Sequence, residues 1–142
     1  MVKASESRYH QCIYFSSNAL ARKIEKLAME SWKKLGLAPS HAYLLMLVLE
    51  EPGVQPGYAA EELQLSPSTV TRLLEKLEEK KLVVRTTEGK LTNIYPTPKA
   101  KELYPQMKNC TREFQEKYQS LINEEEASRL VKSINRINDQ LP

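Results

Sequence analysis

Apolar residues recur at helical spacing along most of the chain, and this pattern predicts a mainly α-helical fold. Between Tyr9 and Leu35 there is no proline or glycine, and apolar residues return every three or four positions. This predicts one long amphipathic helix. Gly36 and Pro39 then suit a helix end and the first turn of the next helix. The segment 40–50, SHAYLLMLVLE, is apolar on all sides, which is typical of a buried central helix.

The middle of the chain predicts two short helices and a hairpin. The segment 51–57, EPGVQPG, contains two Pro-Gly turns, and one or two helical turns follow at 58–63. Ser66 and Pro67 are residue types preferred at an N-cap and at the first helical position. A core-facing stripe follows at i, i+3, i+4 and i+7, made of Val70, Leu73, Leu74 and Leu77.

The period then changes to that of a β-strand and later returns to that of a helix. LVVRTTEGKLTNIYP predicts two short strands around a turn at Glu88-Gly89. Asn123, followed by three glutamates, suits the start of the last helix. The apolar stripes of this C-terminal region consist of Leu103, Met107, Cys110, Phe114, Tyr118 and Leu121, and then of Leu130, Ile134, Ile137 and Leu141. These stripes exceed what one small domain can cover, which indicates a shared interface.

Length, charge and cysteine content narrow the classes and cellular locations that are possible for the protein. A chain of 142 residues suits a single domain over 1–142. The net charge of +3 permits nucleic-acid binding without demanding it, since both signs are mixed along the chain. Two cysteines fit a reducing cytoplasm better than a secreted disulfide framework. We expect no signal peptide, and the longest apolar run is far shorter than the roughly 20 residues of a membrane span.

Catalytic and metal-binding patterns are weak. The two histidines, His10 and His41, belong to no catalytic spacing, and the four glycines form no phosphate-binding loop. The motif HQC at 10–12 has no paired Cys or His ligands elsewhere. We therefore expect no enzyme activity, no metal and no cofactor.

Short helix, tight turn, second helix and hairpin is the order of a winged helix-turn-helix, in which the second helix enters the DNA major groove. Its outward N-terminal face carries hydroxyls and an arginine that can contact phosphates or bases. Glu75, Glu78 and Glu79 lie further along, where the helix should leave the groove. The alternative is a surface helix with a polar face. The candidate DNA-binding residues are Ser66, Ser68, Thr69, Thr71, Arg72, Lys76, Arg85 and Lys90.

The segments LSPSTVTRLLEKLEEKKLVVR and PTPKAKEL resemble the MarR family of bacterial transcriptional regulators. The resemblance implies a mainly α fold with a small β-wing, in which a DNA-binding lobe (40–98) is flanked by dimerisation helices (9–35 and 99–141). It implies a homodimer that binds a pseudo-palindromic double-stranded DNA operator, in most cases as a repressor. Three features depart from the family pattern. Lys81 and Ala100 replace glycines, and the wing tip reads Glu88-Gly89-Lys90 instead of Asp-x-Arg.

The resemblance also implies a signal that releases the DNA, either a small aromatic or lipophilic effector or an oxidant. Cys12 is similarly placed to the reactive cysteine of the branch that senses organic hydroperoxide, and Tyr43 matches one tyrosine of that branch. Ser16, Lys26 and Ser40 stand where other tyrosines are expected. The alternative for Cys12 is a small packed residue. Cys110 lies on a core stripe, with a role as resolving thiol as the alternative.

A bound effector should lie where the dimerisation helices meet the winged lobe. Tyr9, Tyr14, Trp32 and Tyr43 are the candidate lining residues, and a plain aromatic core is the alternative. A winged helix can also bind protein instead of DNA, because fold alone does not fix function. Salt dependence separates these two functions, since DNA binding weakens steeply as salt is added.

Overall fold

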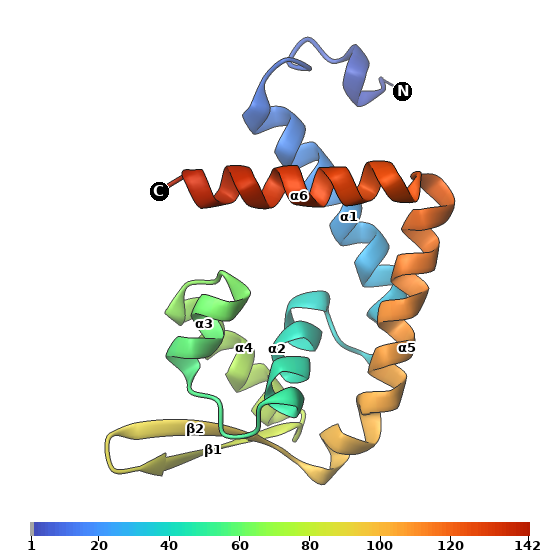
Figure 1. The fold of residues 1–142 in the computed structure, drawn as a ribbon. Coiled ribbons are helices and arrows are strands. Elements are labelled where there is room, and N and C mark those ends of the chain that lie inside the picture. The colour runs from blue at the N-terminus through green and yellow to red at the C-terminus, as the bar shows by residue number, and fades with distance from the viewer. Residues whose placement is uncertain (1) are drawn as a thin grey trace.

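The computed structural model describes residues 2–142, which form six α-helices and one two-stranded antiparallel sheet (Figure 1). The helices are α1 (Ile13–Trp32), α2 (Pro39–Glu50), α3 (Pro56–Leu63), α4 (Pro67–Glu79), α5 (Pro98–Leu121) and α6 (Glu124–Gln140). The strands are β1 (Val83–Glu88) and β2 (Leu91–Pro96), and the short 3-10 turns are η1 (Ala4–Glu6) and η2 (Lys33–Leu35). The expected mainly α fold with a small β-wing is confirmed.

The first long helix begins later than the sequence predicts. Helix α1 begins at Ile13, not at Tyr9, because the preceding residues form tight turns. The backbone N–H of Cys12 donates to the carbonyl of Tyr9 at 2.9 Å, and Cys12 itself has the extended conformation of an N-cap residue. At the other end, Gly36 has a φ of +67° after η2 and ends the helix as predicted.

The core lies between α2, α4, α5 and the base of the hairpin. Helix α2 is central, as its apolar sequence predicts, and the stripe of α4 packs against it. The largest fully buried side chains include Trp32, Leu44, Leu45, Val48, Val70, Leu74, Leu77, Ile94, Met107 and Cys110. This core fixes which face of α4 points outward.

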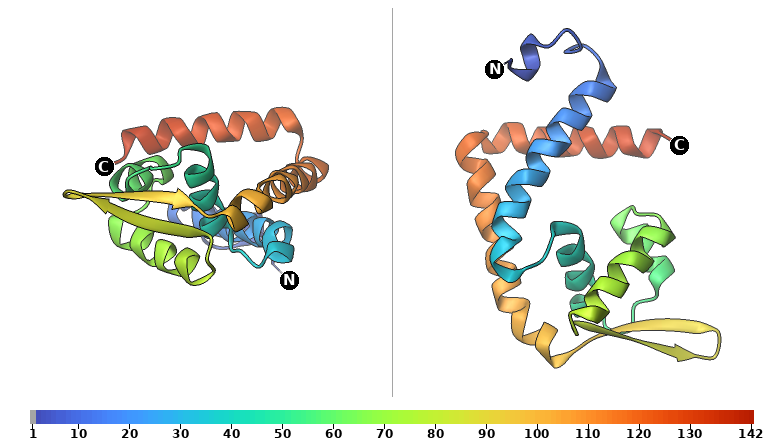
Figure 2. Two further views of the ribbon diagram at one scale, coloured as in Figure 1. Left: turned by 90° about the horizontal axis from the view of Figure 1, so that it is seen from below. Right: turned by 180° about the vertical axis from the view of Figure 1, so that it is seen from behind.

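The hairpin is anchored to the core through Ile94, which pairs with Arg85 across the sheet. On its other side, Ile94 exchanges hydrogen bonds with the loop before α3. Its N–H donates to the carbonyl of Val54 at 2.9 Å, and its carbonyl accepts from Gly53 at 2.7 Å. Strand β2 is therefore paired on both edges at Ile94, whereas the tip of the hairpin projects away from the helices (Figures 1 and 2).

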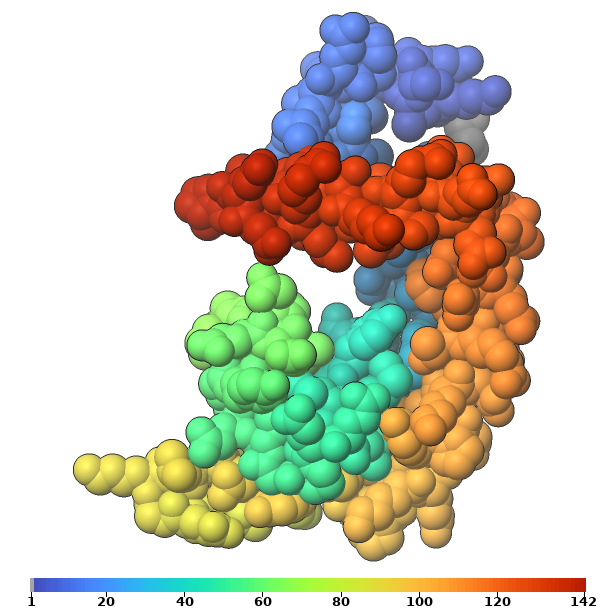
Figure 3. Space-filling model, in the orientation of Figure 1, coloured from blue at the N-terminus to red at the C-terminus, as the bar shows by residue number. Residues whose placement is uncertain are grey.

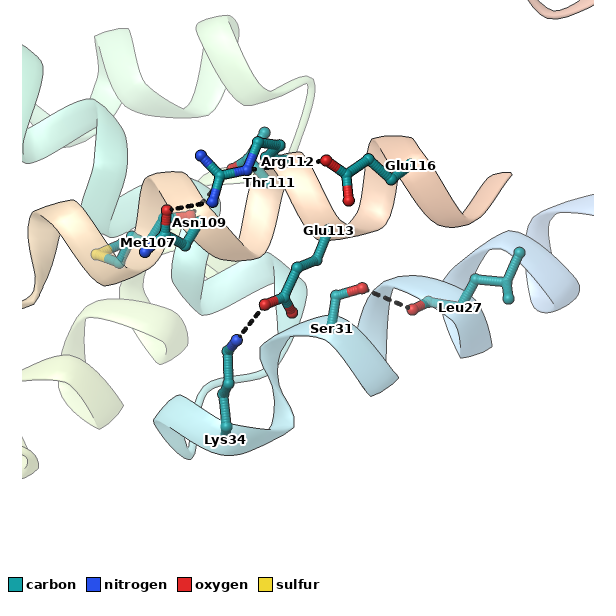
Figure 4. A network of polar contacts seen from close by, with 9 residues as sticks. All are labelled: Leu27, Ser31, Lys34, Met107, Asn109, Thr111, Arg112, Glu113 and Glu116. Carbon is teal, nitrogen blue, oxygen red and sulfur yellow. Dashed lines mark hydrogen bonds and ion pairs between the residues drawn. The ribbon is translucent and has the colours of Figure 1, made fainter. Parts of the chain in front are cut away.

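Helices α1 and α5 lie side by side and connect the winged lobe to the terminal helices. Ion pairs join Lys34 to Glu113 and Lys117 to Glu30, and Figure 4 shows the first of these beside the buried Ser31. Helix α6 then turns away from α5 and has no buried residue (Figure 1). Among the described residues, no helix combines the length and apolar character needed to cross a membrane.

Candidate nucleic-acid interface

A side-chain hydroxyl caps the N-terminus of α4. Ser66 is the N-cap residue, and its Oγ accepts a hydrogen bond from the backbone N–H of Thr69 at 3.2 Å. The hydroxyl of Thr69 lies 2.8 Å from the same oxygen. Pro67 occupies the first helical position, where it has no N–H to leave unpaired. The predicted cap is confirmed, and the hydroxyls of Ser66 and Thr69 serve the helix itself.

The buried stripe of α4 orients the rest of the helix. Val70, Leu74 and Leu77 are completely buried, so the opposite face lies in solvent. Ser68, Thr71, Arg72 and Lys76 are exposed on the side away from the core. The view from behind in Figure 2 looks onto α4, with the hairpin projecting beside its C-terminal end. The structure thus places these four candidates on one accessible surface, together with the positive end of a helix dipole.

The side chain of Arg72 is held by one weak hydrogen bond and can reach into solvent. Its guanidinium donates to the hydroxyl of Thr69 at 3.3 Å, and the hydroxyl of Thr71 donates to the carbonyl of Pro67 at 3.0 Å. Arg72 forms no ion pair among residues 2–142. A planar guanidinium on an exposed helix face can grip guanine through two hydrogen bonds.

Two of the candidate cations are paired with acidic residues of α4. Lys76 lies 3.7 Å from Glu79, with both side chains more than half exposed. Arg85, on β1, forms an ion pair with Glu78. The sequence predicts that Glu78 lies outside the groove but does not reveal its link to Arg85, because the pairing depends on how the hairpin packs on the helix. The period of two along β1 would have indicated which face Arg85 occupies, but not its partner.

The wing tip is a tight turn that carries one cation. Gly89 has a φ of +64°, a conformation that suits glycine, and Lys90 follows it in solvent. Lys90 forms no ion pair within the described part of the chain. Of the candidate cations on the hairpin, Lys90 is therefore the one left available.

His41 adds no charge to this surface at neutral pH. It lies half-buried in the first turn of α2. Burial lowers the pKa of His41, and the positive charges of Lys80 and Lys76 lower it further. Within residues 2–142, no group of three or more His, Cys, Asp or Glu residues is arranged to hold a metal ion.

A wide groove separates α6 from the winged lobe, and Figure 3 shows the hollow between α6 and α3. It has a volume of about 1160 Å³ and is lined by residues of α1, α2, α3 and α6, with Phe114 of α5 and residues flanking these helices. Tyr14 and Tyr43, two of the candidate residues, line it. The groove opens at the predicted junction between the terminal helices and the lobe.

Two of the predicted lining residues lie elsewhere. Trp32 is only 1% exposed and belongs to the core, because the last turn of α1 packs against α2 and α5. Tyr9 is 60% exposed and precedes α1, with its ring centroid 6.1 Å from that of Phe15. The expectation that these two rings line the groove is corrected by this placement.

The two cysteines have opposite environments. Cys12 is exposed at the N-cap of α1. Cys110 is completely buried on α5, and this burial raises the pKa of its thiol. The position of Cys12 suits an accessible thiol, whereas Cys110 lies in the core as its stripe predicts.

The chain matches one family model and is similar to a curated transcriptional repressor. The MarR family model matches residues 35–90. The HTH-type transcriptional repressor MdtR of Bacillus subtilis (strain 168) is 32% identical over 78 residues, which are 55% of this chain and 50% of that protein. The match thus spans about half the length of this curated relative.

Solved structures extend the likeness of the fold to nearly the whole chain. The S. aureus MepR-DNA complex has a TM-score of 0.78 at 19% identity, covering 91% of this chain and 98% of that one. The transcriptional repressor CouR bound to p-coumaroyl-CoA has a TM-score of 0.85 at 15% identity, covering 98% and 100%.

The fold and the exposed α4 surface define a winged helix-turn-helix protein. Within this fold, residues 35–90 match the MarR family model, which covers the helix-turn-helix and reaches the wing. MdtR and CouR are both transcriptional repressors.

Proposed function

We propose that this chain is a sequence-specific DNA-binding transcriptional regulator that places the N-terminal half of α4 in the major groove. The observation that carries the proposal is the capped start of α4, which presents Ser68, Thr71 and Arg72 to solvent while its opposite face is buried. This surface lies within the segment that matches the family model. MepR, a protein of the same fold, forms a complex with DNA.

The proposed active form is a homodimer that uses 40–98 as the DNA-binding lobe and 9–35 with 99–141 as dimerisation helices. Ile13 and Tyr14 of α1, and Ile134 and Ile137 of α6, are exposed in the single chain. Apolar faces of this extent are stable in water when another surface covers them. A second copy would cover them and would place two α4 helices on a pseudo-palindromic operator.

The dimer is tested by sedimentation of the full chain and of Ile137→Glu. We expect a dimer for the parent and a shift to monomer for the variant, because a buried glutamate at the interface is unfavourable. Lys132→Glu, on an exposed position of the same helix, is the control and should leave the dimer intact. A monomeric parent chain would contradict the proposal.

We further propose repression in the cytoplasm, relieved by one of two signals. We place a small aromatic or lipophilic effector on the Tyr43 side of the groove, next to the surface that the second copy covers. The repressor CouR, which has the same fold, binds p-coumaroyl-CoA. Alternatively, an organic hydroperoxide oxidises the exposed Cys12.

A winged-helix module that binds protein is the second candidate. The observation that favours it is the internal pairing of Arg85 with Glu78 and of Lys76 with Glu79, which leaves few free cations near the wing. Selection of duplexes from a randomised DNA pool separates the two functions. Enrichment of one palindromic sequence supports the DNA-binding regulator, whereas no enrichment supports the protein-binding module.

A further inference from the structure

The ion pair between Glu78 and Arg85 connects the last turn of α4 to the middle of β1. The two side chains are 34% and 32% exposed, so both are partly withdrawn from water. By contrast, Lys76 and Glu79 are both more than half exposed and belong to the same helix. Glu78 and Arg85 therefore join two elements whose relative placement decides how the protein can meet DNA.

The hairpin supplies no acidic partner of its own for Arg85. Side chains alternate between the two faces of a strand, so Arg85 and Thr87 share one face of β1. Glu88, the carboxylate at the end of β1, points to the other face and forms no ion pair in the described chain. The carboxylate that holds Arg85 therefore comes from α4.

The base of the hairpin is fixed by different contacts. The hydroxyl of Thr97 donates to the carbonyl of Lys81 at 2.8 Å, and its N–H donates to the carbonyl of Leu82 at 3.1 Å. Among the contacts of residues 2–142, Glu78–Arg85 is the ionic contact that ties the strands to α4 beyond this base. Without it, the outer part of the hairpin would be held only by this base and by the backbone hydrogen bonds of Ile94 with Gly53 and Val54, none of which involves α4.

We propose that Arg85 is a positioning residue that sets the angle of the wing through Glu78, and that it does not contact DNA phosphate. The cation that the wing offers to the DNA backbone is then Lys90, which is exposed at the tip and unpaired within the described residues. The part of this inference that concerns phosphate rests on the proposed DNA-binding function. The part that concerns the angle of the wing is independent of that function.

The wing is tested first, on the full chain without DNA, by amide hydrogen exchange of β1 and β2. Glu78→Gln and Arg85→Gln should each accelerate exchange of the strand amides by about two- to five-fold, as expected for loss of a partly exposed ion pair. The double variant Glu78→Arg/Arg85→Glu restores the pair with reversed charges and should exchange like the parent. Unchanged exchange in the single variants, or no recovery in the double variant, would overturn the proposal.

Whether Arg85 contacts DNA phosphate is tested by the salt dependence of binding to a duplex that the parent protein selects from a randomised pool. Arg85→Gln should lower affinity about two- to five-fold with the same slope of log affinity against log salt, and the double variant should recover the affinity. Lys90→Gln is the matched control, whose slope should fall by about 0.9 for each lost phosphate contact, or about 1.8 for the two copies of the proposed dimer. Such a fall for Arg85→Gln, without recovery in the double variant, would overturn the proposal.

The two experiments separate failure of this inference from failure of the proposed function. If the parent protein selects no duplex, DNA binding is wrong, and hydrogen exchange still decides whether Glu78 holds the wing. If the parent selects a duplex and the exchange of the single variants is unchanged, DNA binding stands and the positioning role of Arg85 is wrong.

Discussion

The backbone N–H of Thr69 donates a hydrogen bond to the Oγ of Ser66 at 3.2 Å, which satisfies one of the free donors at the start of α4. Ser66→Ala removes this acceptor and should lower the free energy of unfolding by about 1 kcal/mol. Ser66→Asp should retain most of the stability, since aspartate is an equally good cap. Urea unfolding measures both changes.

Ser68→Ala is the matched control for the cap. Ser68 is exposed in the first turn of α4 and accepts no backbone hydrogen bond among residues 2–142, so its removal should change stability by less than about 0.5 kcal/mol. Equal losses for Ser66→Ala and Ser68→Ala would show that the cap does not stabilise α4.

Lys81 carries strain that a glycine would relieve. It has a φ of +60° at the end of α4, a conformation that costs a residue with a Cβ about 1 kcal/mol. Lys81→Gly should therefore raise the free energy of unfolding by about 0.5–1 kcal/mol, measured by urea unfolding. Lys80→Gly is the control, because Lys80 has an ordinary φ of −80° and its replacement should destabilise. A loss of stability in Lys81→Gly would contradict the assigned backbone conformation.

His41 should make stability fall in mild acid. Burial, with help from Lys80 and Lys76, lowers its pKa in the folded protein below the ordinary value of 6.5. As pH falls through 6.5, the unfolded chain binds a proton at His41 before the folded chain does, so protonation favours unfolding. This contribution to stability is complete above 6.5 and is lost as pH falls toward the lowered folded pKa.

Urea unfolding at several pH values, for the parent and for His41→Gln, measures this effect. The difference in stability between the two proteins should change with pH below 6.5 and be constant above it. His10→Gln is the control, because His10 is exposed before α1. A parent-minus-variant difference that is independent of pH would contradict the burial of His41.

Much of the fold follows from local signals along the sequence. Ser66 with Pro67 and Gly36 are found in the roles that their side chains predict, because caps depend on a few neighbouring atoms. The amide oxygen of Asn123 likewise accepts hydrogen bonds from the N–H groups of Glu125 and Glu126. Local chemistry thus determines where most helices begin and end.

Features that depend on tertiary packing were not predictable in the same way. The apolar periodicity of α1 is compatible with Trp32 in a pocket or in the core. Trp32 lies in the core because α1 packs against α2 and α5. The pairing of Arg85 with Glu78 and the bridge between Val54 and Ile94 also join residues that are distant in sequence. The late start of α1 at Ile13 reflects backbone turns that no apolar pattern reveals.

Arg72 and Lys90 should have different effects on DNA recognition. Arg72→Ala should weaken binding to the selected duplex by about 1–3 kcal/mol and reduce discrimination between duplexes, if Arg72 reads a base edge. Lys90→Ala should weaken binding to all duplexes about equally, because a phosphate contact carries no base information. Competition binding against a mutated duplex measures both. Parent-like discrimination in Arg72→Ala would contradict the placement of α4 in the groove.

Cys12 should determine any response to organic hydroperoxide. If its thiol is the sensor, cumene hydroperoxide should release the parent protein from DNA and a thiol reductant should restore binding. Cys12→Ser should bind DNA normally and fail to respond. Cys110→Ser is the control for the buried thiol and should still be released by the oxidant. An unchanged response in Cys12→Ser would rule out the sensing role.

DNA recognition through α4 is tested most directly by titrating the parent protein with duplex DNA from its own upstream region, at about 50 and about 200 mM salt. We predict binding that exceeds binding to unrelated DNA at both concentrations and weakens steeply between them, as several phosphate contacts are lost to screening. Binding that is equal for unrelated DNA, or absent at both concentrations, would contradict a sequence-specific regulator built on α4.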